Sequence, residues 1–122
     1  MLDSTQFDHF ELLGGFIIIR IDFDDEPLID AIGREAIART AIIGHEFEIT
    51  ICPGLSEKEL SVTLYHEVLE AAAVASDDPP ESLIEFNEGD FEAAAYAAHD
   101  RFGFVTPANL NLMLQSHGFH EP

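Results

Sequence analysis

The stretch LSVTLYHEVLEAAAVAS, residues 60–76, is largely apolar, and besides the Tyr65 phenol its ionisable side chains are those of His66, Glu67 and Glu70. The length of the stretch and the spacing of its apolar residues predict a helix that is mostly buried. Two carboxylates and an imidazole inside such a helix are unfavourable unless a metal ion, a network of polar partners or a water-filled cleft compensates them. The function of the chain therefore depends largely on which of these three is present.

The residues on either side mark the ends of this central helix. Ser56 is followed three residues later by Glu59, which is the spacing of a capping box at a helix N-terminus. The sequence DDPP at residues 77–80 ends the helix, because proline lacks an amide hydrogen and disfavours helical geometry in the residue before it. The predicted helix therefore covers about residues 57–75.

His66 and Glu70 are four residues apart, so they lie on the same face of the predicted helix, one turn from each other. Glu67 is rotated from His66 by about 100°. This is the layout of the H-E-x-x-H helix, in which the first and last residues bind zinc and the glutamate is the general base. Glu70 replaces the second histidine here. A carboxylate also ligates zinc, but it makes the site more anionic and shifts its preference toward Mn²⁺ or Fe²⁺. The alternative is a polar network or a cleft rim that holds no metal.

A catalytic zinc site needs a third protein ligand and an open position for water. The second predicted helix offers four candidates, namely Glu88, Asp90, Glu92 and His99. Glu88, Glu92 and His99 share one helical stripe beside the apolar residues, and this geometry favours Glu92. Asp90 lies on the other flank, where it is also suited to cap the helix together with Asn87.

The other elements predict a single α+β domain over residues 1–122. Residues 16–23 (FIIIRIDF) are rich in β-branched and aromatic residues, which is typical of a central strand. Gly44 and His45 form the turn between two more strands, and residues 28–39 are either a short helix or an irregular arm leading into a strand. The expected fold is a small antiparallel or mixed sheet of about three strands, packed on the central helix, with two further helices. The two strands on either side of Gly44 and His45 span residues 40–43 and 46–52. The two further helices span residues 90–102 and 107–117.

The composition limits the partners and the compartment. The chain has 122 residues, of which 47% are hydrophobic, and a formal net charge of −19. This charge disfavours nucleic acids and anionic membranes as partners. It is compatible with cation binding, with a basic protein partner, or with a saline or acidic-proteome host, and the expected partner is a protein or a peptide. No apolar run is long enough to span a bilayer. The acidic N-terminus argues against a signal peptide, and the single cysteine, Cys52, cannot form an internal disulfide. We therefore expect a cytoplasmic protein, and the sequence leaves its oligomeric state open.

Two segments resemble the motifs of a known family. Residues 63–70 (TLYHEVLE) are similar to the T-L-x-H-E-h-x-H motif of the small zincin-like metallopeptidases of the ImmA/IrrE type, and residues 90–97 (DFEAAAYA) are similar to their E-x-x-A-x-x-F-A motif. The resemblance covers about residues 46–115. It implies a zincin-like fold and one divalent metal ion, which would be zinc by the family pattern, with manganese, iron or no metal as the alternatives.

Carried over by position, the resemblance makes His66 the first metal ligand, Glu67 the general base, Glu70 the second ligand and Asp90 the third. Glu70 and Asp90 depart from the histidine and the glutamate of the family. The motif therefore favours Asp90, while the helical stripe favours Glu92 as the alternative third ligand.

Two classes of function follow from these residues. The first is a metal-dependent peptidase or related hydrolase, in which Tyr65 or His99 would be an auxiliary group that steadies the oxyanion. The second is a non-catalytic zincin-like or acidic regulatory module that engages a protein partner.

Overall fold

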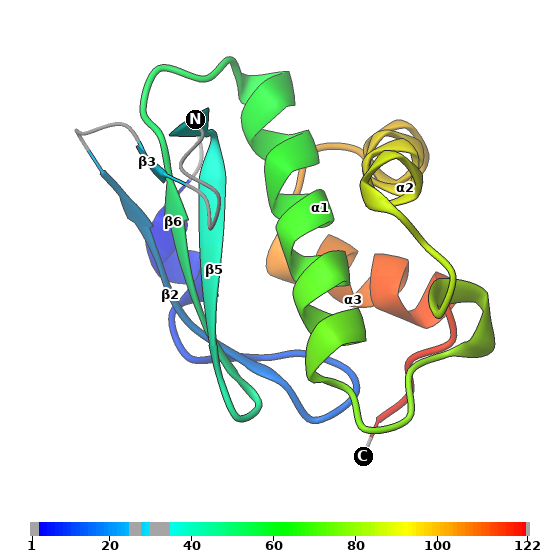
Figure 1. Ribbon diagram of the computed structural model, residues 1–122. Coiled ribbons are helices and arrows are strands. Elements are labelled where there is room, and N and C mark those ends of the chain that lie inside the picture. Colours follow the sequence, from blue (N-terminus) through cyan, green and yellow to red (C-terminus); the bar gives the residue numbers. More distant parts are fainter. Residues whose placement is uncertain (1–2, 25–27, 30–34, 122) are drawn as a thin grey trace.

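Strand β6 (Glu46–Ile51) shows how the sheet acquires one buried face. In the computed structural model, which describes residues 3–24, 28–29 and 35–121, Phe47, Ile49 and Ile51 are buried while the residues between them are partly exposed. Successive side chains of a strand point to opposite faces of the sheet, so these apolar side chains form one continuous surface. The helices lie on this side of the sheet (Figure 1).

The main sheet has four strands in the order β1, β2, β6, β5, which is one strand more than expected. Strands β1 (Phe10–Glu11) and β2 (Ile17–Phe23) are antiparallel, whereas β2 and β6 are parallel. Strand β5 (Ala38–Ile43) pairs with β6 in the expected antiparallel hairpin, whose turn holds Gly44 at a φ of 65°. The sheet is therefore mixed, and β5 is at one edge of it among the described strands.

A parallel pair of strands requires a long connection between them, and here it contains short strands of its own. Strands β3 (Leu28–Ile29) and β4 (Glu35–Ala36) pair antiparallel and lead into β5. The described parts of residues 28–39 thus form strands rather than a helix, and residues 30–34 lie outside the described part of the chain. Two 3₁₀ turns complete the irregular segments, η1 (Ser4–Phe7) and η2 (Glu81–Leu83).

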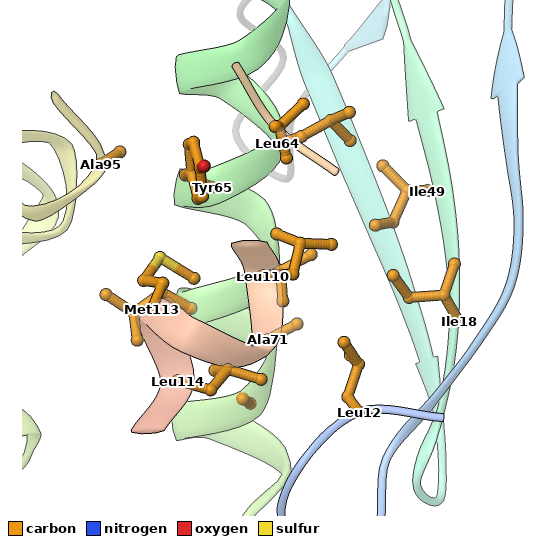
Figure 2. Close-up of a cluster of buried hydrophobic side chains, with 14 of the residues drawn as sticks. Leu12, Ile18, Ile49, Leu64, Tyr65, Ala71, Ala95, Leu110, Met113 and Leu114 are labelled. Atoms are coloured by element: carbon orange, nitrogen blue, oxygen red, sulfur yellow. The ribbon is translucent and has the colours of Figure 1, made fainter. Parts of the chain in front are cut away.

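Helix α1 (Glu57–Ala75) lies between the sheet and helix α2 (Glu88–Phe102) (Figure 1). Its predicted start is confirmed, because the Ser56 side chain accepts from the Glu59 amide and the Glu59 side chain accepts from the Ser56 amide. Leu64 and Tyr65 are completely buried on different sides of the helix. Figure 2 shows Leu64 on the side of Ile49 in the sheet and Tyr65 on the side of α2. This burial on two sides explains why the apolar residues of α1 are not confined to one stripe.

Helix α2 (Glu88–Phe102) begins two residues earlier than expected, directly after its N-cap residue Asn87. It ends at Gly103, whose φ of 88° favours glycine. Helix α3 (Pro107–Ser116) follows, with Thr106 as its N-cap and proline as its first residue, as the sequence predicts. The earlier start of α2 brings Glu88 into its first turn, and this determines the composition of the site described below.

The α+β class predicted from the sequence is confirmed. The core combines the inner face of the sheet with residues of all three helices, including Leu110, Met113 and Leu114 of α3 (Figure 2). Of the helices within the described residues, none has both the length and the apolar character needed to cross a membrane.

Candidate metal centre

A cleft of about 490 Å³ lies where the middle of α1, the first turns of α2 and the beginning of β5 meet. Strand β5 contributes Ala38, preceded by Ile37, and α1 contributes Val62 to the apolar part of its lining. The ionisable side chains that line it are His66, Glu67, Glu70, Glu88 and Glu92. Residues 66–70 (HEVLE) of α1 are therefore surrounded by α2 and β5, which are distant from them in sequence.

Three of these side chains converge closely enough to hold one ion. The Nε2 atom of His66 lies 2.9 Å from Oε2 of Glu70 and 3.3 Å from Oε2 of Glu88. One ligand-type atom from each residue lies within 4.8 Å of the other two. Ligand atoms about 2.1 Å from a tetrahedral metal ion are separated by roughly 3.4 Å, so small side-chain rotations would bring these three atoms to metal-binding positions. A ligand set of one imidazole and two carboxylates suits zinc, and it also suits manganese or ferrous iron.

The local sequence explains how each of the three is positioned. His66 and Glu70 are one turn apart on α1, and their side chains are 22% and 30% exposed at the cleft. Glu88 is the first residue of α2, where the positive end of the helix dipole favours a carboxylate. Its side chain is 77% exposed, so it approaches the cleft from the solvent side.

The charges of the site are strongly coupled. The hydrogen bond to Glu70 raises the pKa of His66, and the negative charges of Glu70, Glu67 and Glu88 act in the same direction against partial burial. The same hydrogen bond lowers the pKa of Glu70. A protonated His66 is thus held as a cation between two carboxylates, and a metal ion that binds at Nε2 competes with this proton.

Burial raises the pKa of Glu67 to about 7, while the nearby His66 partly opposes the shift. The side chain lines the same cleft as the three converging residues. Within the described part of the chain it has no hydrogen-bond partner, so its carboxylate is available to a ligand in the cleft. A carboxylate with a pKa near neutrality is matched to the task of a general base.

The structure separates the two residues proposed as third ligand. Asp90 belongs to the capping box of α2, where its carboxylate accepts from the Asn87 amide at 3.0 Å and its own amide donates to the Asn87 side chain at 2.9 Å. Glu92 lines the cleft, but the converging group contains Glu88 instead of either of them. Glu88 is one of the four candidates that the sequence offers and shares a helical stripe with Glu92, one turn earlier, although that stripe favours Glu92.

The two proposed auxiliary residues lie away from the cleft lining. Tyr65 is completely buried, its hydroxyl donates to the Gly103 carbonyl at 2.9 Å, and burial raises the pKa of its phenol to about 12. His99 forms a hydrogen bond through Nδ1 with the Ser61 hydroxyl at 2.8 Å. Both side chains therefore connect α1 to the end of α2 and the segment after it, and neither faces the site.

Ser61 is the central residue of the hydrogen bonds that connect α1 to His99 and to the segment after α2. It is completely buried, and its hydroxyl oxygen accepts from the Val105 amide at 2.9 Å as well as bonding to His99. Ser61→Ala should lower the free energy of unfolding by about 1–3 kcal/mol, because it leaves a buried amide without a partner. Urea denaturation measures this loss, and Ser82→Ala at an exposed position is the matched control, with an expected effect within about 0.5 kcal/mol. Equal effects of the two substitutions would contradict the role assigned to Ser61.

No protein-family model matches the chain, and neither the curated proteins nor the solved structures contain a significant match to it. His66, Glu70 and Glu88 form a candidate metal centre at an open cleft, and the partly desolvated carboxylate of Glu67 lies beside it.

Proposed function

We propose that this protein is a zincin-like, metal-dependent hydrolase that acts on peptides. The observation that carries the proposal is the convergence of His66, Glu70 and Glu88 from two helices within 4.8 Å at a cleft. The adjacent Glu67 gives the α1 segment the order of groups found in the H-E-x-x-H helix, with glutamate at the last position. The resemblance of residues 63–70 to the zincin-like motif supports the same conclusion.

In this proposal His66, Glu70 and Glu88 would bind the ion, and Glu67 is the general base. A divalent ion in this position supplies Lewis acidity, which acidifies water and polarises a carbonyl group. The Glu67 carboxylate accepts the proton of the attacking water and delivers it to the leaving amine. Partial burial keeps this carboxylate from being strongly hydrated, and it forms no hydrogen bond within the described residues.

The position of β5 favours an extended peptide as the substrate. β5 is at the edge of the sheet among the described strands and packs beside α1 (Figure 1). Its first residue, Ala38, lines the cleft. The backbone groups of an edge strand are free to pair with a further strand, so a peptide added there would run past the candidate metal centre.

The choice of metal follows from the ligand set. Zinc is the metal that the zincin resemblance implies, whereas a site with two carboxylates and one imidazole is also suited to Mn²⁺ or Fe²⁺. The site holds only one nitrogen ligand from the described residues, so we expect weaker zinc binding than in sites with two histidines.

The test is a metal titration of the protein purified without an affinity tag. Elemental analysis and calorimetric titration with Zn²⁺, Mn²⁺ and Fe²⁺ should give one ion per chain. Because the ion binds the folded state, the melting temperature should rise with metal concentration. At a free metal concentration of 100 times the Kd, the free energy of unfolding should be about 2.7 kcal/mol higher than without metal. Cleavage of unfolded protein substrates by the loaded form is then measured. Failure of all three metals to bind in excess would overturn the proposal, and metal binding without cleavage would indicate a non-catalytic module that engages a protein partner.

A further inference from the structure

One ionisable residue of the cleft has no part in the chemistry proposed above. His66, Glu70 and Glu88 form the converging group and Glu67 is the base, which leaves Glu92. Glu92 is four residues after Glu88 on α2, so it lies on the same helix face, one turn further along. Its side chain is exposed and lines the same cleft. It is therefore placed to meet a part of a bound ligand other than the reacting group.

Besides its ionisable residues, Thr63 and Gly89, the cleft is lined by three apolar residues, namely Ile37, Ala38 and Val62. Val62 of α1 is buried beneath it, and Ile37, just before β5, is 51% exposed although it is a large hydrophobic residue. An apolar surface next to a carboxylate matches a side chain with an aliphatic stem and a charged end, as in lysine and arginine.

Apart from His66, the ionisable side chains that line the cleft among the described residues are all carboxylates. No lysine or arginine of the described residues lines the cleft, and the chain as a whole carries a net charge of −19. The Arg20 side chain pairs with Asp22 and Glu48 on the sheet, while Lys58 lies over the Tyr96 ring. A cationic ligand is consequently the complement of this cleft, and an acidic peptide is repelled from it.

We infer that Glu92 is a specificity residue that selects peptides with a lysine or arginine side chain close to the bond to be cleaved. Its carboxylate pairs with the cationic end, and the apolar wall that includes Ile37 takes the aliphatic stem. This inference rests on the proposed peptidase function, because only then is the bound peptide a substrate. Binding of the peptide can nevertheless be measured without turnover.

The experiment compares three fluorescein-labelled peptides that are identical except for a central Lys, Gln or Glu. Their affinities for the wild-type protein, Glu92→Gln and Glu46→Gln are measured by fluorescence anisotropy, in the presence of chelator and again with Mn²⁺. Glu46 is an exposed glutamate on β6 and lies outside the cleft lining. Because both substitutions replace a glutamate by glutamine, they change the net charge by the same amount. We expect the wild type to bind the Lys peptide about three- to tenfold more tightly than the Gln peptide. Glu92→Gln should remove most of this preference and Glu46→Gln should retain it.

The possible results separate this inference from the hydrolase proposal. Loss of the preference in Glu92→Gln alone supports the inference, even if the protein binds no metal and cleaves no peptide. Equal binding of the three peptides, an equal loss in both variants, or no binding of any peptide overturns it. If metal binding and cleavage occur while the preference is absent, the hydrolase proposal stands and the assignment of Glu92 falls.

Discussion

Glu67→Gln should abolish hydrolysis while leaving metal binding intact. The loaded variant is expected to lose about 10²–10⁴-fold in kcat, because the amide cannot accept the proton of the attacking water. Its affinity for the ion should stay close to that of the wild type, since the converging group consists of His66, Glu70 and Glu88. Initial rates on a peptide substrate and a calorimetric metal titration of the same preparation measure both quantities. Retained turnover in a fully loaded Glu67→Gln sample would refute the role of Glu67.

The stability of the same variant without metal provides an independent check on the environment of Glu67. Burial raises the pKa of Glu67 to about 7 in the folded protein, so between its ordinary pKa and pH 7 the folded state binds more protons than the unfolded state. Stability that depends on this residue therefore decreases as the pH rises through that range. Glutamine has the same size and does not ionise. The stability of Glu67→Gln relative to the wild type should increase from pH 5 to pH 8 in urea denaturation with chelator present. A difference that is constant with pH would show that Glu67 is not desolvated.

The central helix was predictable because its signals are local. The capping box of Ser56 and Glu59 and the prolines after the helix depend only on residues close in sequence, and the structure has the helix at Glu57–Ala75 as expected. The alternation in β6 is equally local. The same applies to the relation between His66 and Glu70, which follows from helix periodicity and is seen as a 2.9 Å contact.

The third member of the site was harder to predict because it depends on how two helices pack. The sequence places Glu88 and Glu92 on one stripe of α2, but only the contacts of Phe91, Ala95 and Ala98 with the core fix the rotation and height of α2 against α1. Asp90 was favoured through a motif register, and its side chain instead serves the local hydrogen bonds of the helix N-terminus. Tyr65 precedes His66 in the sequence, but adjacent helical residues point in different directions, and the Tyr65 hydroxyl donates to the Gly103 carbonyl.

Removal of any member of the converging group should weaken metal binding strongly. His66→Ala and Glu88→Ala should each reduce metal affinity by at least about 100-fold, because loss of an outer partner alone costs about 10–100-fold and these residues would bind the ion directly. Asp90→Asn should leave the affinity nearly unchanged, since an amide oxygen can still accept from Asn87 at the helix N-terminus. Calorimetric titration with Zn²⁺ and Mn²⁺ on folded samples, checked by circular dichroism, gives the three affinities.

Comparing Glu88→Ala with Asp90→Asn shows which residue is the third ligand. The structure points to Glu88, and the family motif points to Asp90. Glu88 and Asp90 are two residues apart in the first turn of α2, and both are acidic and exposed, so the two substitutions change the local charge equally. A general electrostatic attraction for cations would make the two variants similar, and a ligand at Asp90 would reverse their order. A large loss in Glu88→Ala with retention in Asp90→Asn requires that the ion be bound at one defined position. That position is where the first turn of α2 approaches His66 and Glu70, with a 3.3 Å contact between Nε2 of His66 and Oε2 of Glu88.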